Sequence, residues 1–182
     1  MNFFEMLIMS RKMAFQDGTV TLYGENVLIF PAPSIIKYIC LTGTDPKNAK
    51  ELYHMAKESI LERRGNINST GNSEADVSWV IDTVNLYGLG KLHYQETAGT
   101  APAGIIIVEN SPFSNSPDCM VGAPMDHILR GILAGMASAV FNKELEAVET
   151  ECRVVGSSVC KIALDTKENL MKRYPAMYKA QT

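Results

Sequence analysis

The spacing of apolar residues along the chain alternates between a helical and a strand pattern. Apolar residues three to four positions apart predict helices over residues 1–12, 34–43, 46–64, 75–87 and 124–142. Short or alternating apolar runs predict strands in a meander over 12–31, at 91–98 and 103–110, and in a hairpin over 145–164. A last helix is predicted over 168–178, where Pro175 disturbs it. The pattern predicts a single α+β domain over residues 1–182, with an antiparallel sheet packed against helices.

Composition and charge narrow the classes of function. The 182 residues are 46% hydrophobic and 20% charged, which is typical of a soluble globular protein. A net charge of −3 provides no basic field for nucleic acid. No apolar run reaches the ~18 residues needed to cross a bilayer, and the N-terminal segment, interrupted by Glu5, is too short for a signal peptide. We therefore expect a cytoplasmic protein with reduced cysteines.

Two of the four cysteines lie in the predicted C-terminal hairpin. A hairpin centred on Gly156 places Cys152 directly opposite Cys160, with Cβ atoms roughly 4.5–5.5 Å apart. Strand alternation puts both cysteines and Val148 on the buried face and aims Glu149 at water on the other face. Glu149 can join the cysteines only if a β-bulge lies between residues 149 and 152.

Two thiols are half of a tetrahedral zinc site, so further ligands are needed. Cys119, Asp126 and His127 lie at or just before the N-terminal end of the helix at 124–142, and any of them could reach the cysteine pair. Each has an ordinary alternative: an acid in the first turn favours the helix dipole, and a histidine or a thiol can simply be buried.

The helix at 124–142 has two predicted contact faces. Its apolar stripe should face the sheet and consists of Ile128, Leu129, Ile132, Leu133, Met136 and Val140. Gly131 and Gly135 are one turn apart and predict a close approach to a neighbouring element. The charges of Asp126 and Arg130 argue against a membrane-spanning glycine motif.

The C-terminal third resembles the 4-vinyl reductase domain family, also called hydrocarbon-binding proteins. The resemblance rests on a Gly-x-x-x-Gly helix, a Glu-x-x-Cys segment, a glycine four residues after that cysteine and a second cysteine four further on, here Gly131, Gly135, Glu149, Cys152, Gly156 and Cys160. The family usually has an aromatic residue two positions later, where this chain has Ile162. The resemblance implies a ligand-binding α+β fold like that of nitric-oxide-sensing domains and trafficking-complex subunits.

The resemblance also implies a zinc ion near the ligand pocket. In related sensor domains the ligands are a cysteine at the start of the long helix, the glutamate and the two hairpin cysteines. Glu149, Cys152 and Cys160 match this set, whereas Asp126 stands at the position of the helix cysteine. Asp126, His127 or Cys119 would complete a structural zinc site.

The predicted function is non-enzymatic binding or sensing of a small hydrophobic or aromatic molecule. No phosphate loop or dinucleotide fingerprint is present, since GLGKL at 88–92 lies between helix and strand in the wrong order. Vinyl reductase activity is therefore not predicted. The predicted pocket lies between helices and sheet, and its walls are Trp79, Val80, Val84, Ile106, Phe113, Ile132 and Met136.

The predicted partners are a second copy in a homodimer and a separate regulatory protein, with neither nucleic acid nor membrane. Two alternatives remain open: a redox switch built on the cysteines, and a subunit that binds an acyl chain or a partner helix.

Overall fold

The computed structural model of the protein describes residues 3–10, 12–22, 24–27, 31–63, 67, 69–97, 102–116, 119 and 122–182. The chain divides into two compact units, Met1–Ile35 and Ile36–Thr182. The single domain over 1–182 stays a prediction, and each unit is described by itself.

The first unit is a short helix followed by a β meander. Helix α1 (Phe3–Met9) precedes strands β1 (Met13–Gln16), β2 (Thr19–Leu22) and β3 (Glu25–Val27), which form an antiparallel sheet in chain order. Asp17 and Gly18 connect β1 to β2 and both have positive φ, 49° and 78°. Two such residues are typical of the tight turn that fits the twist of a hairpin. The helix and the meander predicted from sequence are thereby confirmed.

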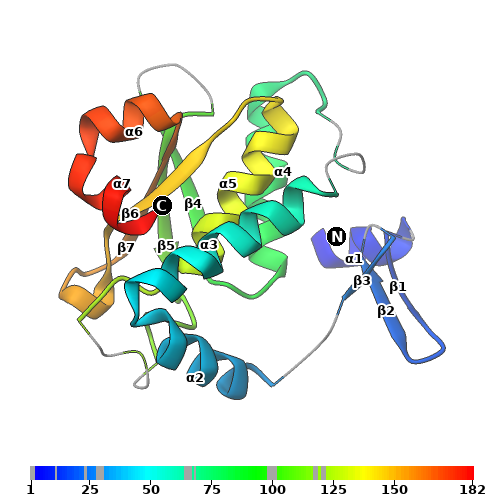
Figure 1. Ribbon diagram of the computed structural model, residues 1–182. Helices are drawn as coiled ribbons and strands as arrows, with labels where there is room; N and C mark the ends of the chain where they lie inside the picture. The colour runs from blue at the N-terminus through cyan, green and yellow to red at the C-terminus, as the bar shows by residue number, and fades with distance from the viewer. Residues whose placement is uncertain are drawn as a thin grey trace. The chain divides into compact units, whose positions relative to one another are not determined.

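The second unit is an antiparallel sheet packed against helices, as predicted (Figure 1). Its strands are β4 (Lys91–Glu96), β5 (Gly104–Glu109), β6 (Glu146–Glu151) and β7 (Cys160–Asp165), in the order β4-β5-β7-β6. Its helices are α2 (Ala32–Gly43), which begins before the boundary between the units, α3 (Pro46–Leu61), α4 (Ser73–Leu86), α5 (His127–Phe141), α6 (Lys167–Arg173) and α7 (Pro175–Gln181). Pro175 ends α6 and occupies the first turn of α7, where its missing N–H costs nothing.

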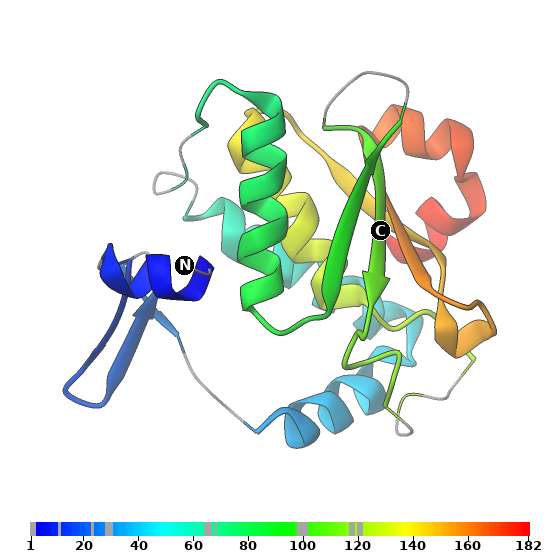
Figure 2. The same ribbon diagram turned by 180° about the vertical axis from the view of Figure 1, so that it is seen from behind.

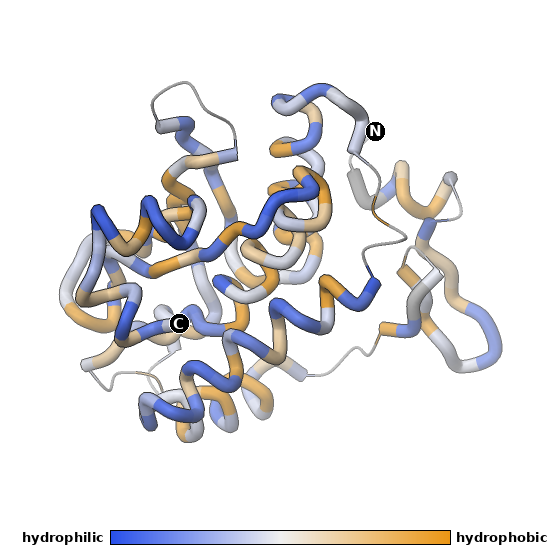
Figure 3. Tube along the Cα trace, turned by 45° about the horizontal axis from the view of Figure 1, so that its top comes forward, coloured by the Kyte–Doolittle hydropathy of each residue, from blue (hydrophilic) through white to orange (hydrophobic). Residues whose placement is uncertain are grey.

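Helices lie on both faces of this sheet (Figure 2). The main core joins α3, α4 and α5 to one face and includes Leu129, Leu133 and Ile162. On the other face Val148 and Ala163 pack beneath Leu170 of α6. The expectation that this second face meets water is therefore wrong, because the two C-terminal helices cover part of it. Figure 3 shows hydrophobic and hydrophilic residues alternating along the helices, as expected for helices buried on one side.

The glycines of α5 allow close packing against α3, as predicted. A Cβ at Gly131 would collide with the carbonyl oxygen of Tyr53 and lie 2.8 Å from the Cβ of Ala56. A Cβ at Gly135 would lie 2.8 Å from the carbonyl oxygen of Lys57. The two helix backbones therefore approach more closely than any larger side chain permits.

A β-bulge at Thr150 sets the direction of Glu149. Before the bulge, Glu149 pairs with Ile162 of β7; after it, Glu151 pairs with Lys161. The inserted residue turns Glu149 onto the same face as the cysteines, and it moves Val148 to the opposite face. The predicted bulge is confirmed, and the predicted position of Val148 is corrected for the same reason.

The described residues contain no helix that is both long and apolar enough to span a membrane.

Candidate functional site

Three side chains from the β6–β7 hairpin converge in the interior. One ligand atom each of Glu149, Cys152 and Cys160 lies within 4.8 Å of the others, and all three residues are buried. The two sulfur atoms are 3.8 Å apart, and the backbone N–H of Arg153 points at Sγ of Cys160, 3.4 Å away. Gly156 reverses the chain between the cysteines with φ of 99°. This cluster can hold a metal ion.

Asp126, the residue before α5, lies against the cluster. Its side chain is fully buried and does not cap the helix. Its backbone N–H donates to Oε2 of Glu149 over 3.3 Å, and the Ser111 hydroxyl donates to its Oδ1 over 2.6 Å. The Asp126 carboxyl also interacts electrostatically with Glu149 and Cys160. Asp126 therefore borders the cluster, but it is not one of the three residues whose ligand atoms all lie within 4.8 Å of one another.

His127 and Cys119 lie elsewhere, which corrects the expectation that either could reach the cysteine pair. The Nε2 of His127 donates to the carbonyl of Gly43 over 3.1 Å, and its Nδ1 accepts from Arg130 over 3.1 Å. Both ring nitrogens are therefore already used. Cys119 forms a disulfide with Cys40 of α2, which also differs from the expectation of four reduced cysteines.

The residues around the cluster fit a cation. Oδ2 of Asp126 and Oε1 of Glu149 are buried without a hydrogen-bond partner, a costly arrangement for carboxyl oxygens unless an ion satisfies them. Burial raises the pKa of Glu149 to about 7, and it raises the pKa of Asp126 well above its usual range. A divalent ion among these groups would restore the charged carboxylates. Two sulfurs with two carboxylate oxygens are donors that zinc accepts.

The two thiols share their protons unequally. The contact between the sulfurs lowers the pKa of Cys160 to about 5 and raises the pKa of Cys152. One thiolate therefore forms readily while the second proton is held tightly. A cation bound to both sulfurs would displace the second proton as well.

Arg130 of α5 is a fully buried cation behind the cluster. It donates to the carbonyl oxygens of Ala147 over 3.1 Å and Gln181 over 3.3 Å, and its guanidinium carbon lies 4.8 Å from the ring centre of Tyr53. Burial lowers the pKa of Arg130, and Glu149 is the neighbour that opposes this shift most. Arg130 was visible in the sequence only as a charge that interrupts an apolar helix.

Gln181 of α7 contacts the backbone of Glu149. Its Nε2 donates to the Glu149 carbonyl over 2.8 Å, and its Oε1 accepts from the Glu149 N–H over 2.8 Å. No sequence pattern pointed to this residue, because it lies 32 positions from its partner, in a different element.

Most of the predicted pocket residues are packed in the core. The main core buries Val80, Val84, Ile106 and Met136, and Trp79 and Ile132 pack against it. Phe113 lies in a second cluster with Cys40 and Cys119. Of the predicted residues, only Val80 and Ile106 line an apolar gap between α4, α5 and the sheet. The volume of this gap is about 10 Å³, which holds about one water molecule.

A larger apolar pocket of about 390 Å³ lies between α7, the α2–α3 turn and the start of α5. Its lining is Gly43, Thr44, Pro46, Ala49, Ala123, Pro124, His127, Ala176, Met177, Ala180 and Gln181. Burial, followed by the nearby Arg130, lowers the pKa of His127 to about 4, so its ring is neutral at neutral pH. The lining therefore carries no ionised side chain, and the volume is within the usual range for small-molecule sites.

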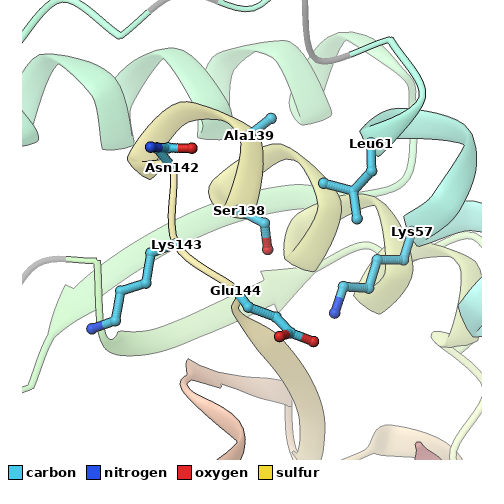
Figure 4. Close-up of a pocket in the computed structure, with 7 residues that line it drawn as sticks. All are labelled: Lys57, Leu61, Ser138, Ala139, Asn142, Lys143 and Glu144. Carbon is cyan, nitrogen blue, oxygen red and sulfur yellow. The ribbon is translucent and has the colours of Figure 1, made fainter.

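Figure 4 shows a third, more polar pocket of about 280 Å³ beside the connection from α5 to β6. Its lining is Lys57, Leu61, Ser138, Ala139, Asn142, Lys143 and Glu144. Lys57 forms a buried ion pair with Glu146 over 2.8 Å, and the Ser138 hydroxyl accepts from the N–H of Leu145 over 2.9 Å. These groups stabilise the fold and are not available to a ligand.

Comparison with known proteins places these features in a family context. The family model of the 4-vinyl reductase domain matches residues 105–166. An uncharacterized protein, MJ1642 of Methanocaldococcus jannaschii, is 34% identical over 85 residues, which are 47% of this chain and 52% of that relative. The chain thus matches about half the length of this curated relative.

Two solved structures share the fold. The phenol-responsive sensory domain of the transcription activator PoxR, solved with phenol, aligns over 93% of this chain and 92% of its own, with a TM-score of 0.73 and 16% identity. A vinyl-4-reductase family protein from Methanocaldococcus jannaschii aligns over 76% of this chain and 83% of its own, with a TM-score of 0.53 and 18% identity. The α+β fold predicted from sequence is confirmed by these matches.

Proposed function

We propose that this chain, whose residues 105–166 belong to the 4-vinyl reductase domain family, binds or senses a small hydrophobic molecule and carries a structural zinc ion. The observation that carries the metal proposal is the buried cluster of Glu149, Cys152 and Cys160 beside Asp126, with two carboxyl oxygens that have no hydrogen-bond partner. The fold shared with a phenol-responsive sensory domain supports the ligand-binding role.

Asp126, Glu149, Cys152 and Cys160 would hold the zinc. Four protein donors leave no open coordination position, so zinc would join the start of α5 to the hairpin and supply no reaction chemistry. Arg130 behind the cluster would offset part of the negative charge of the donor set. Taken together, these groups act to bind and stabilise, and none is placed as a nucleophile or base beside a cavity.

The ligand would occupy the pocket beside α7. An apolar lining without ionised side chains favours an uncharged molecule of one or two rings or a short aliphatic chain. The neutral His127 at the pocket wall has both nitrogens engaged by protein groups, so shape and apolar contact would dominate recognition.

The metal content of the purified protein tests the proposal of a structural zinc ion. Plasma mass spectrometry of protein purified without tag or chelator should find about one zinc per chain, and a free-thiol count should find shielded cysteines. Cys160→Ser should lose the zinc, whereas the control Ser158→Ala, an exposed residue in the same turn, should keep it. Wild-type protein without metal and with unreactive thiols would mean that the cysteines are ordinary core residues.

Calorimetric measurement of phenol binding tests the proposal that the chain binds a small hydrophobic molecule. Ala180→Trp fills the pocket and should weaken binding at least about tenfold, the loss expected when apolar contacts are replaced by overlap. Lys179→Trp is the matched control, because the neighbouring position does not line the pocket. Equal affinity in both variants would place the ligand elsewhere.

A thiol redox switch is the second candidate function. The sulfurs of Cys152 and Cys160 are 3.8 Å apart, so a peroxide can oxidise the two thiols to one disulfide while it is reduced to two hydroxyl products, with both thiol protons transferred. Reversible zinc release on peroxide treatment, with intramolecular linkage seen by mass spectrometry, would favour this function.

We also propose the two protein partners and the cellular location that were predicted from the sequence. A homodimer, a separate regulatory protein and a cytoplasmic location fit a sensor without an output domain in these residues. Light scattering at defined concentrations tests the dimer. Copurified acyl chains would favour a lipid-carrying subunit instead.

A further inference from the structure

Among the strands that the structure describes, β6 lies at the edge of its sheet, so no described strand pairs with the outward backbone groups of Ala147 and Glu149. Side chains engage all four groups. The N–H of Ala147 donates to the Tyr53 hydroxyl over 3.3 Å, and its carbonyl accepts from Arg130 over 3.1 Å. The N–H and carbonyl of Glu149 are both bonded to the Gln181 amide, each over 2.8 Å.

The amide of Gln181 is hydrogen-bonded to the backbone of Glu149, a residue whose strand pairing is irregular. The bulge at Thr150 interrupts the β6–β7 ladder immediately after Glu149, which removes regular backbone support on that side. Gln181 supplies support from the opposite edge, and it is only 8% exposed. The bulge sets the face on which the Glu149 carboxyl lies, and the Gln181 amide holds the backbone that carries this carboxyl.

Glutamine suits this position because its amide offers one donor and one acceptor, like the edge of a strand. Alanine would remove both hydrogen bonds, and glutamate would lose the donor while adding a charge near Glu149. Arg130 also bonds this end of α7, because it donates to the backbone carbonyl oxygen of Gln181 over 3.3 Å. One buried cation thus joins the start of the hairpin, helix α5 and the end of α7.

We propose that Gln181 is a positioning residue for the metal cluster, and that docking of α7 and binding of metal at the hairpin stabilise each other. The inference rests on the proposed metal site. Groups that hold a ligand residue in place typically change metal affinity by about 10–100-fold. Coupling between two binding events is reciprocal, so metal must tighten α7 as much as α7 tightens the metal.

Titration of the metal-free full chain with zinc, against a chromophoric competitor, tests the first direction. Gln181→Ala should weaken zinc binding by about 10–100-fold, whereas Lys179→Ala, on the same helix with an exposed side chain, should change it less than about twofold. Cobalt spectra add a readout that general destabilisation would not move. Thiolate-to-cobalt charge transfer should persist in Gln181→Ala, while the ligand-field bands should shift as the Glu149 oxygen is lost.

Hydrogen exchange of the wild-type chain tests the reverse direction and does not depend on any variant folding. Amides of residues 176–182 should exchange more slowly with zinc bound than without it. Unchanged zinc affinity in Gln181→Ala, together with unchanged exchange in α7, would overturn the inference and leave the metal site standing. A wild-type chain that binds neither zinc nor cobalt would overturn both this inference and the proposed metal site.

Discussion

Protonation of His127 should destabilise the metal-free protein as the pH falls. His127 is 4% exposed, its Nε2 donates to the carbonyl of Gly43 and its Nδ1 accepts from the cationic Arg130. A second proton would make the accepting nitrogen a donor that faces a group of like charge. Burial first, and Arg130 second, lower the pKa of His127 from 6.5 to about 4.

The direction and the size of the change in the free energy of unfolding follow from the linkage between proton binding and folding. A group whose pKa is depressed by folding contributes stability that is present above its unfolded pKa and is lost as the pH falls toward its folded pKa. At 1.36 kcal/mol for each pKa unit, the shift of His127 corresponds to about 3 kcal/mol in total. About 2 kcal/mol of this should be lost between about pH 7 and about pH 5.

Urea unfolding of wild type and His127→Gln, both with chelator, isolates this contribution. Glu149 and Asp126 have raised pKa values, so they favour the folded state at low pH in both proteins, and the difference between the two pH profiles reports His127. The wild-type free energy of unfolding should fall by about 2 kcal/mol more than that of the variant over this range. Parallel profiles would refute the assignment of a buried neutral histidine.

Three further predictions concern packing, charge pairing and metal binding. Gly131→Ala should lower the free energy of unfolding in urea by about 1–3 kcal/mol, because its Cβ would overlap α3; an unchanged value would contradict the close helix contact. Lys57→Met should cost about 3–5 kcal/mol in the same assay by leaving Glu146 buried and unpaired, and adding Glu146→Gln should recover part of the loss; no recovery would contradict the pairing. Zinc affinity, measured by calorimetry, should rise with pH through about 7, because Glu149 and Cys152 must both lose protons to bind; a constant affinity between about pH 6 and pH 8 would contradict ligation by these groups.

Much of the fold could be predicted because its elements have strong hydrophobic periodicity. The glycine spacing of α5 also predicted its close packing, since Gly131 and Gly135 share a face at helical spacing. The bulge at Thr150 could be predicted from a conflict: strand alternation aims Glu149 at water, whereas the cysteine motif requires it inside. A single inserted residue resolves that conflict.

Contacts between distant segments could not be predicted in the same way. Nearness in sequence to the start of α5 suggested His127 and Cys119 as ligands, but one residue of helix turns a side chain by about 100°. His127 therefore faces the α2–α3 turn, where it bonds to Gly43. Most of the predicted pocket residues are packed in the core, because apolar spacing indicates burial and does not indicate empty space. The pocket beside α7 depends on where the C-terminal helix packs, which no local pattern specifies.

The occupied edge of β6 restricts how copies of this chain can assemble. The outward N–H and carbonyl groups of Ala147 and Glu149 are already bonded to side chains, so this stretch of β6 cannot pair with a strand from another molecule. The predicted homodimer must therefore use another surface, and a continuous intermolecular sheet through β6 would first require α7 to leave. Release of Gln181 would free the outward N–H and carbonyl of Glu149, so we expect the last turn of α7 to oppose edge-to-edge pairing at this point.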